Sequence, residues 1–265
     1  MRFKNYFPAG LGQVVILLGI FVFFHTDVKS QDITVYQFRQ VPQDKAAEFV
    51  RRETTYWSKV AKKAQDNGKM EFWALFEKVG GDDLQNSPNY LFINTFKNID
   101  QNMGDVFNAK GLFPTIPLEK METNSMSKTT AEYFFRNDGW EQKAKAVPEK
   151  DFNYVVFYFH NSSNADSFAT LEKKYWAPFI KSAMDKNQTS QAAWGNAVVL
   201  TPVGNDVKFN SISFDLFPTL KDALIPRWDA NVTFPAEGMS AINSIRLNRP
   251  SREVYRVVKV VSKNM

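Results

Sequence analysis

The chain has 265 residues, of which 44% are apolar and 15% aromatic, and its formal net charge is +5. This length accommodates one large domain or two small ones with a sizeable core. The charge is too small and too evenly scattered to indicate a nucleic-acid partner. The sequence has no cysteine, which excludes disulfides and a lipid anchor on cysteine.

The first 30 residues have the pattern of a signal peptide. A basic start is followed by an apolar run over 11–24, and Val28 and Ser30 then place small residues where a signal peptidase reads them. The run is shorter than the ~20 residues that a helix needs to cross a bilayer. We therefore expect residues 1–30 to be removed and the mature protein to be periplasmic or extracellular, without stable membrane insertion. An uncleaved membrane anchor is the alternative.

The mature chain begins with a predicted β-α-β-β-α-β series. Runs of β-branched and aromatic residues indicate the strands, and apolar residues at helical spacing indicate one long and one short helix. The expected strands are 33–41, 71–79, 90–96 and 131–136, and the expected helices are 46–66 and 99–110.

The same series then starts again. A Pro-containing linker near 145–150 separates the two halves, so we place the domains at 31–147 and 148–265. In the second half the expected strands are 152–160, 192–201, 210–217 and 253–261, and the expected helices are 165–185 and 220–228.

The two long predicted helices carry the same residues at the same places. A shift of 119 residues aligns Glu53 with Glu172, and a Tyr-Trp pair follows each acid. Most of the shared positions fall at helical spacing, so they describe one face of each helix, and we interpret them as an internal repeat. The other aligned pairs are Ala46/Ala165, Phe49/Phe168, Tyr56/Tyr175, Trp57/Trp176, Lys62/Lys181, Ala64/Ala183 and Asp66/Asp185 and, at a shift of 121, Phe107/Trp228, Phe113/Phe234 and Glu132/Glu253.

Each half is expected to form a four-stranded antiparallel sheet with two helices on one face, the ferredoxin-like βαββαβ arrangement of an α+β protein. Segments 72–76 and 155–159 are apolar on both faces of their strands, so each sheet needs a second cover. In element order and repeat, the mature chain resembles the dimeric α/β-barrel superfamily, in which two ferredoxin-like units pack sheet to sheet. The resemblance implies a fused pseudo-dimer with an intrachain α/β barrel, either monomeric or weakly homo-oligomeric. The chain carries no diagnostic catalytic motif of that superfamily.

Glu53 and Glu172 are the first candidates for catalysis. Each lies one turn after a Phe and one turn before a Trp, so its carboxylate is expected to face the sheet rather than water. A buried acid has a raised pKa and can accept a proton. The alternative is a structural carboxylate that accepts hydrogen bonds from a Tyr hydroxyl, an indole N–H or strand amides. Because both halves retain the acid, we favour the structural role.

His160 is the one histidine that remains after the predicted cleavage. It ends a predicted strand whose alternate residues include Tyr158, and the shift of 119 aligns it with Val41. In the superfamily that the chain resembles, substrates or haem lie between sheet and helices, so His160 is a candidate base or ligand. A lone histidine is more often a structural residue, which is the interpretation we favour. One histidine and scattered carboxylates do not supply the ligands of a metal site.

Aromatic residues of the same regions are the candidates for ligand binding. We predict that a small apolar or aromatic molecule contacts Tyr56, Trp57, Tyr158, Tyr175 and Trp176. The alternative, which we favour for Trp57 and Trp176 together with Trp73, Trp194 and Trp228, is that the rings are core. Trp140 has no aromatic counterpart in the other half and is expected to be exposed.

Three functions are compatible with these features. The first is an exported protein that binds a small apolar or aromatic molecule and needs no cofactor. The second is a cofactor-independent oxygenase, isomerase or decarboxylase of the dimeric α/β-barrel kind, with His160 or Glu172 as base. The third is haem binding through His160. The last two rest on the fold resemblance, and one fold hosts many chemistries.

Overall fold

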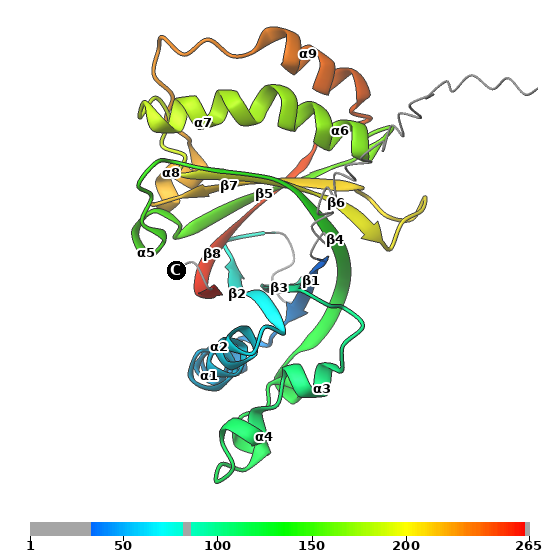
Figure 1. The fold of residues 1–265 in the computed structure, drawn as a ribbon, viewed down its shortest axis with the longest axis vertical. Helices are drawn as coiled ribbons and strands as arrows, with labels where there is room; N and C mark the ends of the chain where they lie inside the picture. Colours follow the sequence, from blue (N-terminus) through cyan, green and yellow to red (C-terminus); the bar gives the residue numbers. More distant parts are fainter. Residues whose placement is uncertain (1–32, 82–85, 263–265) are drawn as a thin grey trace, which may run out of the picture.

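The computed structural model describes residues 33–81 and 86–262. Within these ranges, eight strands form one closed antiparallel barrel in the order β1-β3-β2-β8-β5-β7-β6-β4 (Figure 1). The strands are β1 (Ile33–Gln40), β2 (Met70–Lys78), β3 (Tyr90–Phe96), β4 (Lys128–Gln142), β5 (Tyr154–His160), β6 (Ala193–Thr201), β7 (Ser211–Phe217) and β8 (Ser251–Ser262).

The strand order follows one pattern in the two halves of the chain. The first four strands lie in the order β4-β1-β3-β2, and the last four lie in the order β8-β5-β7-β6. Two strand pairs join the halves, β2 with β8 and β4 with β6. The two sheets therefore share hydrogen-bonded edges, and neither edge is left open.

Alternation along the strands divides the apolar residues between the barrel interior and the outer helical layers. The interior cluster includes Tyr36 and Phe38 of β1, and Phe157 and Phe159 of β5. The intervening residues of the first half, such as Val35, pack instead with the helices outside. The apolar character of both strand faces thus has the predicted cause, since both faces are covered.

The outer face of the first half is covered by a long helical segment with a change of pitch at its centre. It runs through α1 (Gln43–Arg52), the π-helical turn η1 (Glu53–Trp57) and α2 (Ser58–Asp66). Sequence spacing predicted an unbroken helix here. A π turn adds one residue to the turn, and such turns are frequent at functional sites.

The second half repeats this arrangement on the opposite side of the barrel, where Figure 1 shows a further helix. The segment comprises α6 (Ala165–Leu171), the π turn η4 (Glu172–Trp176) and α7 (Ala177–Asp185), and α9 (Ala236–Ile245) lies beside it. A Cβ on Gly238 would lie 2.4 Å from the Cβ of Tyr175, so glycine is what lets α9 approach η4. The sequence did not predict α9.

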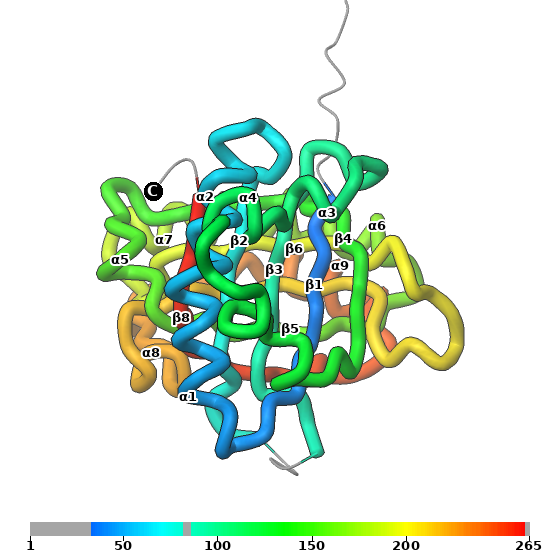
Figure 2. The backbone as a smooth tube through the Cα atoms, turned by 90° about the horizontal axis from the view of Figure 1, so that it is seen from below, coloured from blue at the N-terminus to red at the C-terminus, as the bar shows by residue number. Residues whose placement is uncertain are grey.

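The connections differ more from the prediction than the strands do. β4 extends well beyond the predicted 131–136, because its polar outer residues gave no alternating signal. The expected helices at 99–110 and 220–228 are shorter and the first is split (Figure 2). The remaining elements are α3 (Met103–Val106), α4 (Ala109–Leu112), η2 (Leu118–Lys120), η3 (Asn124–Met126), α5 (Pro148–Asp151) and α8 (Leu220–Leu224).

Among the helices of the described ranges, none has the length and apolar character needed to span a membrane. The predicted signal peptide, residues 1–30, lies outside those ranges. The predicted domain boundary at 147/148 falls between β4 and α5, in a barrel whose hydrogen bonds run through both halves.

Candidate functional site

A pocket of about 330 Å³ lies in the second half, between the outer face of the sheet and the helical layer. β5, β6 and β7 form its floor, and η4, α9 and the connection before α9 form its walls. It brings together charged, polar and aromatic side chains from segments far apart in the sequence. The lining residues are Tyr158, His160, Glu172, Trp176, Gln191, Trp194, Ser213, Asp215, Pro226, Trp228, Phe234, Met239, Ile242, Arg246 and Pro250.

Strand register places the polar residues of the floor side by side. Ser213 of β7 lies opposite Tyr158 of β5 and opposite Asn196 of β6. Asp215, two residues along β7, projects from the same face because side chains alternate along a strand. Trp194 of β6 lies opposite Asp215. The floor is therefore a row of polar groups bordered by a tryptophan.

His160 is buried at one end of this row. Its Nε2 lies 2.7 Å from the hydroxyl of Ser213, and its ring centroid is 4.5 Å from that of Phe168. Burial, together with the positive charge of Arg246, lowers the pKa of His160 to about 3. The imidazole is consequently neutral at physiological pH.

Glu172 opens the π turn η4 and is only 5% exposed. Asn196 donates a hydrogen bond of 3.1 Å from Nδ2 to Oε2 of Glu172. Burial raises the pKa of Glu172 to about 8, against the lowering effects of the Asn196 hydrogen bond and the Arg246 charge. This carboxyl group is mainly protonated at neutral pH, when it is a hydrogen-bond donor.

Asp215 is the second carboxyl group of the pocket and is partly exposed. Gln191 donates a hydrogen bond of 2.6 Å from Nε2 to its Oδ1. Burial of the carboxyl group raises the pKa of Asp215 to about 7, and the Gln191 hydrogen bond and the Arg252 charge act in the opposite direction. A carboxyl group with a pKa near neutrality is suited to exchange a proton with a bound molecule.

Arg246 supplies a positive charge on the helical side of the pocket. Its guanidinium lies 5.5 Å from the Phe168 ring centroid, and Nη1 donates a 2.9 Å hydrogen bond to Asn243. Its buried Nε has no hydrogen-bond partner among the described residues. An anionic oxygen in the pocket would be stabilised by this charge.

Aromatic rings form the apolar side of the pocket. Trp176 stacks on Phe234, with ring centroids 6.4 Å apart and planes 14° from parallel. Trp228 lies 5.0 Å from Phe234 and stacks on Phe179 at 5.9 Å. Flat, apolar walls of this kind favour a flat aromatic ligand.

The corresponding region of the first half has an apolar ring where the second half has a serine. Phe92 lies opposite Gln37 and Leu75, where the second half has Ser213 between its two polar neighbours. Glu53 is buried here too, and the hydroxyl of Thr123 donates a 2.5 Å hydrogen bond to it. Burial raises the pKa of Glu53 to about 7. The serine of the floor is therefore specific to the second half, although Gln37 and Arg39 keep this face of β1 polar in the first half.

Strand pairing also changes the counterpart assigned to His160. His160 lies opposite Ser211, two residues before Ser213, as Arg39 lies opposite Tyr90 in the first half. The counterpart is therefore Arg39, and the alignment with Val41 was wrong by two residues. Arg39 is buried and hydrogen-bonds Ser127 at 2.6 Å.

The predicted site residues divide into two groups. Glu172, His160, Tyr158 and Trp176 meet in the pocket. The remaining candidates contact other parts of the chain. These contacts join Glu53 to Thr123, Tyr56 to Phe113 at 5.4 Å, Trp57 to the Met121 carbonyl at 2.9 Å and Tyr175 to Glu237 at 3.1 Å.

Sequence reasoning missed Ser213, Asp215 and Asn196, and it missed Arg246. Segment 211–216 alternates strictly between small or acidic residues and large apolar ones. That alternation is the signal of a strand with one polar face, and it marks Ser213 and Asp215 as neighbours on that face. Arg246 follows an unpredicted helix and had no such signal.

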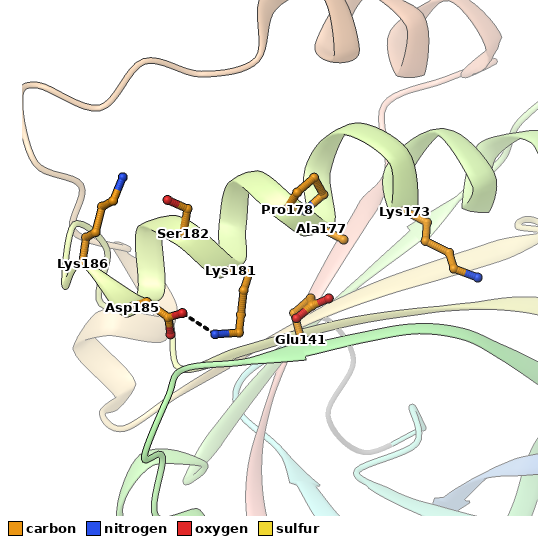
Figure 3. A pocket seen from close by; sticks show the side chains of 8 residues that line it. All are labelled: Glu141, Lys173, Ala177, Pro178, Lys181, Ser182, Asp185 and Lys186. Atoms are coloured by element: carbon orange, nitrogen blue, oxygen red, sulfur yellow. Dashed lines mark hydrogen bonds and ion pairs between the residues drawn. The ribbon is translucent and has the colours of Figure 1, made fainter.

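A larger recess of about 710 Å³ lies on the surface between α7 and β4 (Figure 3). Figure 3 shows charged side chains at its edge, with Lys181 paired to Asp185 and Lys173 and Lys186 at the two ends. Surface pairs of this kind are screened by water. The recess has no buried titratable group, and we assign it no chemistry.

The pocket residues do not supply the ligand set of a metal ion. Within 33–81 and 86–262 there is no cluster of three or more His, Cys, Asp or Glu side chains that could hold a metal ion. An axial haem ligand needs a ring nitrogen free to face the iron. Ser213 engages the Nε2 of His160, whereas Nδ1 has no hydrogen-bond partner among the described residues and Phe168 packs against the ring.

Comparisons with known proteins bear on the fold. Neither a family model nor a curated protein matches the chain. An anthrone oxidase-like protein superimposes with a TM-score of 0.54 and 12% identity, over 89% of this chain and 94% of its own. The "putative monooxygenase" of Lactobacillus acidophilus superimposes with a TM-score of 0.52 and 9% identity, over 88% and 96% of the two chains. One of the same description from Fusobacterium nucleatum gives 0.53 and 11%, over 88% and 94%.

Proposed function

Because the chain has the fold of the dimeric α/β-barrel superfamily, we propose that its second half is an enzyme active site that removes a proton from a small aromatic substrate without a cofactor. The substrate class is an aromatic ketone or phenol. Its reaction with dioxygen, as a cofactor-independent monooxygenase, is the activity we favour.

One observation carries the proposal: two carboxyl groups with raised pKa values share an aromatic-walled pocket. Burial raises the pKa of Glu172 to about 8 and that of Asp215 to about 7. The charge of Asp215 also raises the pKa of Glu172, so the two groups interact electrostatically. Such a pair offers one acid and one base at neutral pH.

The two carboxyl groups have different roles. Asp215 has the lower pKa, so its carboxylate is the base that accepts the substrate proton. Glu172, still protonated, donates a hydrogen bond to the oxygen on which negative charge develops. Arg246 adds its positive charge to the same oxygen. His160 is neutral and buried, and it positions Ser213 rather than titrating.

Oxygenation follows from the same deprotonation. A substrate with an acidic CH₂ group loses one proton to Asp215 and becomes a carbanion stabilised as an enolate. The carbanion reduces dioxygen and forms a C–O bond, and the resulting peroxide loses water to leave a carbonyl. The sum is R₂CH₂ + O₂ → R₂C=O + H₂O, which needs no external electron donor. Two solved structures with this fold carry the description "putative monooxygenase", and one is described as an anthrone oxidase-like protein.

Proton exchange tests the proposed function directly. 2-Tetralone is a two-ring ketone with an acidic CH₂ group, and in D₂O its proton signal disappears as the carbon is deprotonated. We expect the mature protein to accelerate this loss under nitrogen and to consume oxygen with 2-tetralone or anthrone in air. Asp215→Asn should slow the exchange by about 10²–10⁴-fold.

Glu53→Gln is the matched control, because it changes a buried acid of the repeated helix that lies outside the pocket. Its exchange rate should equal that of the wild type. No acceleration over buffer, or an unchanged rate in Asp215→Asn, would overturn the proposed function. Exchange without oxygen uptake would support proton abstraction and exclude the monooxygenase step for these substrates.

Two further features remain proposals. We infer that the two strand orders derive from a fused tandem of ferredoxin-like units, because the orders and the helical segments correspond. We also propose export with cleavage after Ser30. The intact mass of protein purified from its native host should lack residues 1–30, and a full-length mass would contradict cleavage.

A further inference from the structure

We propose that the barrel interior is a second binding site, for an uncharged two-ring aromatic molecule that bears one carbonyl or hydroxyl oxygen. This site is separate from the proposed active site. On β7, Phe214 and Leu216 face the barrel, whereas Ser213 and Asp215 face the helices. The sheet itself divides the two pockets.

The size and composition of the cavity set the ligand class. Its volume is about 330 Å³, and none of its described lining residues is charged. An apolar protein cavity of about 150 Å³ binds benzene, so this volume accommodates two fused rings. Tyr36, Phe76 and Phe157 place ring faces and edges along the wall. A charged ligand would lose its hydration there without compensation.

Three polar side chains at one side of the cavity favour a ligand that carries an oxygen atom. The hydroxyls of Thr34 and Thr95 lie 2.9 Å apart, and Asn137 donates a 2.8 Å hydrogen bond from Nδ2 to Thr34. These two hydrogen bonds use only one of the two hydroxyl protons. The second hydroxyl proton can be donated to a carbonyl or hydroxyl oxygen in the cavity.

Trp140 marks the entrance. It is 49% exposed, and its ring lies 6.2 Å from that of Phe152 and 6.1 Å from that of Phe214. All three residues line the cavity. An aromatic rim that is exposed on one side and continuous with the interior on the other gives a flat molecule a path inward.

The test is isothermal titration of the mature protein with 2-naphthol, and with naphthalene as the matched ligand without oxygen. Val260 faces the cavity from β8, so Val260→Phe fills it. We expect this variant to bind one equivalent of 2-naphthol fewer than the wild type. Thr34→Val should lower the affinity for 2-naphthol by about tenfold, since one hydrogen bond is lost, and should leave the affinity for naphthalene unchanged.

Val203→Phe is the matched control, because Val203 is 65% exposed and lies outside the cavity. It should bind as the wild type does. Leu216→Phe fills the cavity from another strand and replaces Val260→Phe if that variant does not fold. Unchanged stoichiometry and affinity in a folded cavity-filling variant would overturn the proposal.

The 2-tetralone exchange assay separates this inference from the proposed function. Val260→Phe should retain wild-type exchange, because Asp215 and Glu172 lie on the other side of the sheet. Loss of the naphthol equivalent with retained exchange is the expected result. If neither the wild type nor Val260→Phe accelerates proton exchange, but Val260→Phe still binds one equivalent of 2-naphthol fewer, the barrel site stands and the proposed function fails.

Discussion

Asn196 holds Glu172 by a hydrogen bond of 3.1 Å, so the buried acid of the second half is tied to the sheet beneath it. The equivalent acid of the first half, Glu53, is held instead by Thr123, which belongs to a connection outside the sheet. Both acids begin a π turn. The local helix geometry is therefore shared, and the surroundings of the acid decide which half has a pocket.

Replacing Glu172 by Gln should make the stability of the protein less dependent on pH. The pKa of Glu172 is raised from 4.5 to about 8 in the folded state, so its protonated form is the one that the fold favours. Protonated Glu172 contributes fully to stability at pH values below its pKa in the unfolded chain. This contribution is lost as the pH rises through its pKa in the folded protein. Thermal unfolding from pH 5 to 9 should show a falling midpoint in the wild type and a smaller fall in Glu172→Gln.

Two variants are the controls for Glu172→Gln: Glu53→Gln, which changes the equivalent acid of the first half, and Glu149→Gln on the surface. Glu53→Gln should also flatten the pH dependence, but over a range that ends lower, because the pKa of Glu53 is raised only to about 7. Glu149→Gln changes an exposed acid and should follow the wild type. An unchanged slope in Glu172→Gln would show that this carboxyl group is ionised in the folded protein.

The rate of proton exchange should have a bell-shaped pH dependence. The acidic limb reports ionisation of the base, for which Asp215 with a pKa of about 7 is assigned. The alkaline limb reports loss of the proton of Glu172, whose pKa is about 8. The two groups interact, so the apparent values belong to the pair. Glu172→Gln should abolish the alkaline limb, whereas a retained limb would assign it to another group.

Most strands could be predicted from the sequence because burial on two faces leaves a clear apolar pattern, and the barrel was expected from the family resemblance. Segment 155–159 required a cover on each side, and the interior cluster and the helices provide it. The π turns could not be predicted, since Glu53 and Glu172 fit α-helical spacing equally well. Helix α9 was missed because it contains Gly238, a poor helix former, and is held by packing on Tyr175.

The candidate site could be predicted only in part. His160 stood out as a lone histidine, Tyr158 as its neighbour on the same strand face, Glu172 as a repeated acid and Trp176 as a repeated aromatic. Their meeting in one half depends on long-range register, which no local pattern contains. The second half has Ser213 where the first half has the larger Phe92, which leaves room for the pocket. Only the strand pairing shows that these two positions are equivalent.

Ser213→Ala should destabilise the protein more than Ser211→Ala. Removing the Ser213 hydroxyl leaves the buried Nε2 of His160 without its partner at 2.7 Å, which costs about 1–3 kcal/mol. Ser211 is also buried, but its hydroxyl makes only a 3.5 Å contact with Asn210. Urea unfolding of the two variants gives the comparison, and equal losses would show that the His160–Ser213 hydrogen bond adds no stability.

Gly238→Ala should displace α9 and disturb the proposed active site. The added Cβ would lie 2.4 Å from the Cβ of Tyr175, a distance that neither backbone can accommodate without moving. Overpacking of this kind typically costs about 1–3 kcal/mol. Thermal unfolding and 2-tetralone exchange should both be impaired. Ser240→Ala, at an exposed position of the same helix, is the control, and a Gly238→Ala variant that matches it would disprove the close packing.

The first half alone, residues 31–147, should not behave as a stable monomer. In the full chain β2 pairs with β8 and β4 pairs with β6, so the isolated half has two open strand edges. Its inner face also exposes apolar residues, among them Phe38 and Phe76, that the second half covers. The expected outcome is aggregation, or a homodimer that closes a barrel from two copies, whereas residues 31–265 should be monomeric or only weakly associated. Light scattering after size-exclusion chromatography measures both, and a cooperatively unfolding monomer of 31–147 would show that the half needs no partner sheet.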